Sequence, residues 1–154
     1  MYRRYLVGLT GILALLVLSV IAAPVTAQSV KSGLVSTDWL KSNLGSEKIR
    51  IVDVRANVPD YWQGHIKGAL SRFWGEDLKA DGTWKDREEL KAAYGKLGAT
   101  PDTPVIASCG QGQMSAHTYF TLKYLLGYKN VKNYDGSFNE WSNIPDLPIE
   151  TGMK

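Results

Sequence analysis

The segment Val105–Leu126 constrains the fold more strongly than any other part of the sequence. An apolar run over Val105–Ser108 leads to Cys109, the glycine-containing loop 110–114 follows, and a helix is predicted to start near Ser115. Buried strands that alternate with amphipathic helices are typical of α/β proteins with a parallel sheet. The sequence therefore predicts the α/β class, with an open parallel sheet of about five strands and helices on both faces.

The rest of the chain shows the same alternation of strands and helices. Strands are predicted at Val30–Leu34, Ile49–Arg55, Ala69–Ser71 and Val131–Tyr134, the last of which is expected to be the final strand. Helices are predicted at Asp38–Leu44, Tyr61–Gln63 and Leu90–Leu97, and a last short helix runs through Trp141 after Asp135–Ser137, which is predicted as its turn and cap. Asp86 and Glu89 resemble a capping box before the third of these helices. We expect a turn at Asn57–Asp60, and a polar loop at Phe73–Trp84 that either borders the active site or is an ordinary surface loop.

Charged residues occupy one end of the strand Ile49–Arg55. Asp53 and Arg55 lie at its carboxyl end, which is where ligands bind in open α/β sheets. These two side chains therefore either line a binding site or form a structural ion pair. Of the two interpretations we favour the ion pair.

Cys109 is the only cysteine in the chain, so it cannot form an internal disulfide. It lies between a predicted strand and a helix N-terminus, where backbone N–H groups and the helix dipole favour an anion. Such surroundings lower the pKa of a thiol, and the thiolate is the form that attacks sulfur donors. Gly110 and Gly112 lack a Cβ, so they can adopt the backbone angles that let successive N–H groups converge. Cys109 is either a working nucleophile or an inert core residue, and this loop favours the nucleophile.

Residues 1–27 have the features of a signal peptide. Two arginines precede an almost unbroken apolar run at Leu6–Ala22, and small residues lead to a predicted cleavage site after Ala27. The apolar run is also close to the shortest length that spans a membrane, so an uncleaved N-terminal anchor is the alternative. In both cases residues 28–154 form a single exported domain, which we expect in the bacterial periplasm.

Charge and histidine spacing argue against several other functional classes. The chain has 18 basic and 15 acidic residues. Without the two arginines of the leader, 18 minus 2 leaves 16 basic residues and a formal net charge of +1. No nucleic-acid partner is therefore expected, and a membrane is expected as a partner only if the leader stays uncleaved. His65 and His117 are not at metal-ligand spacing with Cys109, so no metal site is predicted.

Four motifs follow one another along the chain. They are Ile51-Val52-Asp53-Val54-Arg55, Tyr61-x-x-Gly64-His65-Ile66-x-Gly68-Ala69, the Cys109 loop, and Tyr134-Asp135-Gly136-Ser137-Phe138-x-Glu140-Trp141. Together they cover nearly all of Val35–Glu150 and resemble the motifs of the rhodanese domain, the thiosulfate sulfurtransferase family. The last motif is similar to that of the catalytic half of tandem rhodaneses, although only one domain fits in this chain. The resemblance implies a rhodanese-like sheet for residues 28–154.

The resemblance also implies that Cys109 is the sulfur-carrying nucleophile. Its thiolate would take the outer sulfur of thiosulfate, expel sulfite, and hold a persulfide until a thiol or cyanide removes the sulfur. The predicted substrate-binding residues are Gly110, Gln111, Gly112, Gln113, Met114, Ser115 and Arg55. No cofactor or general base is required, so we do not expect His117 to be catalytic, and the resemblance makes His65 structural. The expected partners are a small sulfur-donor anion and a thiophilic acceptor, with a partner protein as an alternative source of persulfide.

The loop departs in its charge from the pattern of tandem sulfurtransferases. Those enzymes commonly place a cationic side chain in the loop, whereas Gln111 and Gln113 are neutral, so we expect thiosulfate to be a poor donor. Ser115 stands where Cys-x5-Arg phosphatases carry the arginine that clamps phosphate, which argues against phosphatase or arsenate reductase activity. Two alternatives to a sulfurtransferase remain. One is a persulfide carrier of an exported sulfur-metabolism system, with negligible turnover, and the other is an inactive scaffold with Cys109 as core filler.

Overall fold

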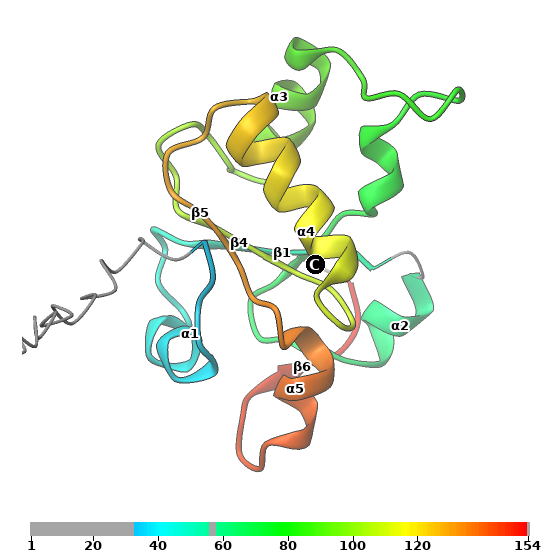
Figure 1. The fold of residues 1–154 in the computed structure, drawn as a ribbon. Coiled ribbons are helices and arrows are strands. Elements are labelled where there is room, and N and C mark those ends of the chain that lie inside the picture. Colours follow the sequence, from blue (N-terminus) through cyan, green and yellow to red (C-terminus); the bar gives the residue numbers. More distant parts are fainter. Residues whose placement is uncertain (1–32, 56–57, 154) are drawn as a thin grey trace, which may run out of the picture. The chain divides into compact units, whose positions relative to one another are not determined.

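The computed structural model describes residues 33–55 and 58–153. At the centre of this part of the chain lies a four-stranded parallel sheet with the strand order β3-β1-β4-β5 (Figure 1). Its strands are β1 (Arg50–Asp53), β3 (Leu70–Ser71), β4 (Val105–Ser108) and β5 (Val131–Asn133). The predicted α/β class and the parallel sheet are therefore confirmed.

The predictions for the N-terminal residues fall largely outside the described part of the chain. This holds for the leader at residues 1–27 and for all but the end of the predicted strand Val30–Leu34. A fifth strand was predicted at Val30–Leu34. In its place, Leu34 forms an isolated parallel bridge with Asn133. Among the residues that the structure describes, no helix is long and apolar enough to cross a membrane.

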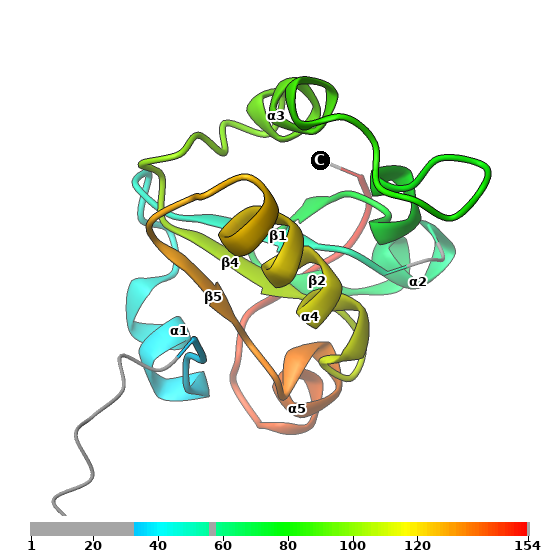
Figure 2. The same ribbon diagram turned by 45° about the horizontal axis from the view of Figure 1, so that its top comes forward.

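Helices cover both faces of the sheet, as predicted (Figure 2). The α-helices are α1 (Thr37–Asn43), α2 (Val58–Gln63), α3 (Arg87–Gly95), α4 (Gln113–Phe120) and α5 (Ser137–Asn143). A 3₁₀ turn, η1 (Trp74–Asp77), lies inside the predicted polar loop, and a π-helical turn, η2 (Thr121–Leu125), continues α4. Helices α3 and α4 lie on one face of the sheet, and α1 and α5 lie on the other.

Successive residues of β1 and β4 pack on opposite faces because strand side chains alternate in direction. Val52 and Val105 belong to a hydrophobic cluster that also contains buried residues of α3 and η2. Ile51 and Ile106 belong to a second cluster, which contains buried residues of α1 and α5. The two central strands are thus covered on both faces, and this explains why their sequences read as continuous apolar runs.

The region around β2 and β6 differs from the prediction. β2 (His65–Ile66) pairs antiparallel with β6 (Ile149–Glu150) in a separate two-stranded sheet. Val131–Tyr134 was expected to contain the final strand, but β6 follows it. Each strand has only two residues, which is too short for an alternating pattern to be detected.

The start of α2 and the cap of α3 also differ from the prediction. Helix α2 begins at Val58, inside the expected turn Asn57–Asp60, because proline is tolerated in the first turn of a helix. The side chain of Asp86 does not cap α3, so the predicted capping box is wrong. Its carboxylate forms an ion pair with Lys79 instead, and Glu89 forms one with Lys85.

Candidate active site

The carboxyl edge of the sheet brings together residues that the sequence singled out. Cys109 follows β4 directly, and Asp53 lies opposite Ser108 in the register of β1 and β4. The N–H of Val54 continues this ladder and donates to the Ser108 carbonyl oxygen at 2.8 Å. Cys109, Asp53 and Arg55 therefore lie at the ends of two neighbouring strands, where open α/β sheets bind ligands.

Gly112 shapes the loop that follows Cys109. Its φ of +88° lies in the left-handed region, which glycine adopts without steric cost. A Cβ at this position would lie 2.5 Å from the Asp135 carbonyl oxygen, so there is no room for a side chain. The turn directs the Gly112 N–H toward Cys109 Sγ, which it reaches at 3.1 Å. It also starts α4 at Gln113, two residues before the predicted start.

Burial and hydrogen bonds act in opposite directions on the Cys109 thiol. Its side chain is 0% exposed, and this loss of hydration raises the pKa of the thiol. Hydrogen bonds from the hydroxyl and N–H of Ser115, the N–H of Gln111 and the hydroxyl of Ser137 outweigh burial and lower the pKa below its ordinary value. Donors that converge on the sulfur therefore favour the reactive thiolate.

Ser137 is a residue of the site that sequence analysis did not identify. Its Oγ accepts the N–H of Cys109 at 3.0 Å and lies 3.8 Å from Sγ. The same Oγ lies 2.8 Å from the Tyr134 carbonyl oxygen, so its one hydrogen can point either to that oxygen or to Sγ. Asp135–Ser137 was predicted only as a turn and helix cap. Its place in the last of the four motifs was the one signal that could have identified Ser137.

The other side chains of the loop differ in their exposure. Gln111 and Gln113 are exposed, whereas Met114 is half-buried and packs against the hydrophobic cluster that contains Cys109. Ser115 is buried, and its Oγ lies 2.8 Å from the Gly112 carbonyl oxygen, so its one hydrogen can point either to that oxygen or to Cys109 Sγ. Because the Cys109 side chain is fully buried, a molecule from solvent reaches Sγ only when part of the loop moves.

Arg55 forms the ion pair that sequence analysis favoured. Its Nη2 lies 2.7 Å from Asp53 Oδ2, and its Nε lies 3.0 Å from both carboxylate oxygens. The carbonyl oxygens of Asp60 and Gly64 accept from Nη1 and Nη2 at 3.1 and 2.7 Å, and the guanidinium lies 4.5 Å from the centre of the Phe138 ring. A guanidinium has five N–H donors. Within the described residues, one donor of Nη1 is therefore left for an anion.

The two histidines lie in other surroundings. His117 stacks on Trp84 with ring centroids 5.4 Å apart and meets Trp74 edge-on at 5.3 Å, which packs the predicted polar loop against α4. Burial lowers the pKa of His117. His65 is fully buried and stacks on the Tyr61 ring. No group of three or more His, Cys, Asp or Glu side chains within residues 33–55 and 58–153 is arranged to hold a metal ion.

Known proteins resemble this chain in sequence. Residues 36–144 match the family model of the rhodanese-like domain. Sulfur carrier protein TtuD of Thermus thermophilus is 44% identical over 117 residues, which cover 66% of this chain and 41% of TtuD. A thiosulfate sulfurtransferase of Corynebacterium glutamicum is 47% identical over 89 residues, which cover 58% of this chain and 29% of that protein. The chain thus spans less than half the length of either relative.

Solved structures resemble the chain in fold. An anaerobic ergothioneine biosynthesis enzyme from Chlorobium limicola, in complex with trimethyl histidine, has a TM-score of 0.70 and 29% identity. A persulfide form of an EanB variant, with ergothioneine, has a TM-score of 0.69 and 29% identity. Each similarity covers 79% of this chain and 32% of the other.

Proposed function

The chain belongs to the rhodanese-like domain family, and from this premise we propose that it is a sulfurtransferase. In this proposal Cys109 carries a sulfane sulfur as a persulfide and passes it to a thiol or to cyanide. The convergence of donors on Cys109 Sγ, above all the Gly112 N–H at 3.1 Å, is the observation that supports it most strongly. The similarity to relatives named sulfur carrier protein and thiosulfate sulfurtransferase adds support.

The first half-reaction moves sulfur from the donor to the protein. The Cys109 thiolate attacks the outer sulfur of thiosulfate, the S–S bond of thiosulfate breaks, and sulfite leaves with the bonding electron pair. The product is the Cys109 persulfide anion, so the total negative charge of the site and its ligands stays the same. The backbone N–H groups of the loop are the donors that would stabilise this anion.

The second half-reaction restores the thiolate. Cyanide, or the thiolate of an acceptor, attacks the terminal sulfur of the persulfide, and the Cys109 sulfur leaves as a thiolate with the electron pair. Neither step requires a proton to be removed when the reactants enter as anions. The mechanism therefore assigns no role as general base to His117.

A persulfide carrier is the second candidate function. Cys109 is fully buried, and the relative with 44% identity is named a sulfur carrier protein. In this alternative a partner protein delivers the sulfur, and turnover with small donors is negligible. Steady-state formation of thiocyanate from thiosulfate and cyanide separates the two candidates, because only the enzyme sustains it.

The native protein allows a joint test of the persulfide and of the leader. Export to the periplasm is part of the proposal and rests on the predicted leader, residues 1–27. We expect intact-mass analysis of protein purified from its own compartment to show a chain that begins at Gln28. A fraction of it should be heavier by about 32 Da, the mass of one sulfur atom, and cyanide should remove this fraction. A mass that begins at Met1 would favour an anchor, and the absence of the heavier species after incubation with a sulfane donor would contradict the persulfide.

A cation in the loop is expected to improve the use of thiosulfate. Gln111 is exposed and lies two residues after Cys109. Thiosulfate carries two negative charges, and a nearby ammonium should contribute about 1 kcal/mol to its binding after screening and desolvation. We therefore expect Gln111→Lys to raise kcat/KM for thiosulfate by about fivefold to tenfold, mainly through a lower KM.

The matched control is Gln111→Met, which has a side chain of similar length without a charge. Thiosulfate kinetics at low and high salt measure the effect, which salt should weaken. A parent protein whose KM is already low would contradict the argument. So would unchanged kinetics of Gln111→Lys at low salt.

A further inference from the structure

The orientation of Arg55 depends on the segment from Asp60 to Gly68, which contains the end of α2, strand β2 and the turn after it. The carbonyl oxygens of Asp60 and Gly64 accept N–H groups from the guanidinium. Together with the Asp53 carboxylate they fix the plane of this group. A shift of the segment would therefore change the direction of the remaining Nη1 donor.

Strand β6 holds this segment in place by pairing with β2. The N–H of Gly152 donates to the Trp62 carbonyl oxygen at 2.9 Å, beyond the end of the paired strands. A Cβ on Gly64 would lie 3.3 Å from the side chain of Ile149. The backbone of Gly64, whose carbonyl group orients the guanidinium, therefore packs directly against β6.

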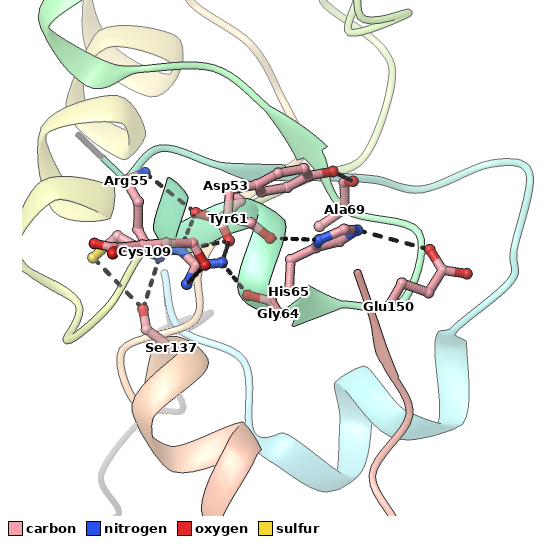
Figure 3. A network of polar contacts seen from close by, with 10 residues as sticks. Asp53, Arg55, Tyr61, Gly64, His65, Ala69, Cys109, Ser137 and Glu150 are labelled. Carbon is pink, nitrogen blue, oxygen red and sulfur yellow. Dashed lines mark hydrogen bonds and ion pairs between the residues drawn. The ribbon is translucent and has the colours of Figure 1, made fainter. Parts of the chain in front are cut away.

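Glu150 is the polar link between β6 and the segment (Figure 3). Its Oε2 accepts the N–H of Gly68 at 3.0 Å and lies 3.9 Å from His65 Nε2. His65 Nδ1 lies 3.0 Å from the Tyr61 carbonyl oxygen, which can only accept. Nδ1 therefore carries a proton, and Nε2 is the atom that faces Glu150. Because His65 is fully buried and its ring centroid lies 3.8 Å from that of Tyr61, a displacement of Glu150 is passed on to α2.

Electrostatic interactions connect the same residues. Burial, followed by the negative charges of Asp53 and Glu150, raises the pKa of Tyr61 to about 12, while the charge of Arg55 opposes this increase. The Tyr61 hydroxyl therefore stays protonated and donates to the Ala69 carbonyl oxygen at 2.6 Å. Glu150 thus acts on the same tyrosine as the Asp53–Arg55 pair.

We propose that Glu150 is a positioning residue for Arg55. Glu150 holds Gly68 by a hydrogen bond and lies beside His65. His65 Nδ1 donates to the Tyr61 carbonyl oxygen in α2. The carbonyl groups of Asp60 and Gly64 orient the guanidinium, whose remaining donor is, among the described residues, free to bind an anion. Figure 3 shows the contacts of Glu150 with His65, of His65 with Tyr61 and of Gly64 with Arg55 in one view with Cys109. The inference deepens the proposed function and rests on it, because it assigns to Arg55 the binding of an anionic donor.

Two substitutions of Glu150 test the proposal. Glu150→Ala removes both the acceptor of the Gly68 N–H and the group that faces His65. Glu150→Gln keeps an oxygen that can accept the Gly68 N–H and has an amide N–H that can donate to His65 Nε2. We expect Glu150→Ala to raise the KM for thiosulfate by about threefold to tenfold with kcat within about twofold of the parent, because the donors around Cys109 are untouched. Glu150→Gln should stay within about twofold of the parent in both constants. Glu88→Ala, which removes an exposed carboxylate from α3, is the matched control.

Anion binding can also be measured without turnover. Sulfate is an inert dianion, and we expect it to protect Cys109 of the parent against alkylation by iodoacetamide. Glu150→Ala should need about threefold to tenfold more sulfate for the same protection. Its alkylation rate without sulfate should equal that of the parent, since iodoacetamide carries no charge for Arg55 to bind.

The outcomes distinguish the positioning role from a structural one. An unchanged KM together with unchanged sulfate protection in Glu150→Ala would overturn the proposal. Equal losses in Glu150→Ala and Glu150→Gln, or an altered alkylation rate without sulfate, would also overturn it by indicating a general defect. A parent that forms no thiocyanate from any donor would instead contradict the proposed function, and sulfate protection would still test the position of Arg55.

Discussion

Replacing Cys109 with serine is expected to reduce thiocyanate formation to background and to leave the fold intact. A serine hydroxyl stays protonated at neutral pH and forms no persulfide. Oxygen is only slightly smaller than sulfur, and the hydroxyl can still accept the Gly112 N–H that now reaches Sγ at 3.1 Å. We therefore expect the thermal midpoint to change by about 5 °C or less.

The measurement combines thiocyanate kinetics with circular dichroism and thermal unfolding. Parent protein alkylated at Cys109 with iodoacetamide is the control, because it removes the same nucleophile by a chemical route. Transfer by Cys109→Ser at a rate close to that of the parent would show that sulfur passes through another group.

Gly112→Ala is expected to lower both activity and stability. An alanine at φ +88° is strained by roughly 1–2 kcal/mol. Its Cβ would also lie 2.5 Å from the carbonyl oxygen of Asp135 and 2.6 Å from Asp135 Oδ1. The neighbouring Tyr134 is tied to the sheet by its N–H, which donates to the Ala107 carbonyl oxygen at 2.9 Å, so the loop has to move instead. This movement takes the Gly112 N–H away from Sγ, and the loss of such a donor corresponds to a fall in kcat of about a hundredfold.

Gly127→Ala separates backbone strain from steric clash. Gly127 has a φ of +75°, and nothing lies within 4 Å of the place that its Cβ would take. We expect this variant to lose roughly 1–2 kcal/mol of unfolding free energy and to keep the kcat of the parent. Urea unfolding and thiocyanate kinetics of both variants give the comparison. Equal losses of stability, or a parent-like kcat in Gly112→Ala, would count against the role assigned to the loop.

The elements of the central sheet could be predicted because their side chains form local patterns. β4 has the predicted bounds Val105–Ser108, and β1 lies within the predicted range Ile49–Arg55. Both are apolar runs that turn signals or charges delimit. β2 and β6 could not be predicted in this way, since they form strands only by pairing with each other, His65 with Glu150 and Ile66 with Ile149, and these residues are far apart in the sequence.

Some residues of the candidate site could likewise be predicted from local patterns, and others could not. Cys109 and the residues up to Ser115 could be predicted together because a strand, two glycines and a helix N-terminus follow one another in the sequence. Ser137 and Glu150 could not be assigned to it from local patterns. Their contacts with Cys109 and Gly68 join residues that are 28 and 82 positions apart.

The sequence by itself determined the α/β class, the place of the nucleophile at the end of a buried strand, and the neutral charge of the loop. Only the tertiary structure decided which hydroxyl groups surround Cys109 Sγ, which carbonyl groups hold Arg55, and that β6 secures the segment behind it. The physical reason is the range of the interactions. Periodicity and loop geometry depend on residues a few positions apart. The polar contacts of the site depend on burial of the two hydrophobic clusters, which holds distant strands together and offsets the entropy of ordering them.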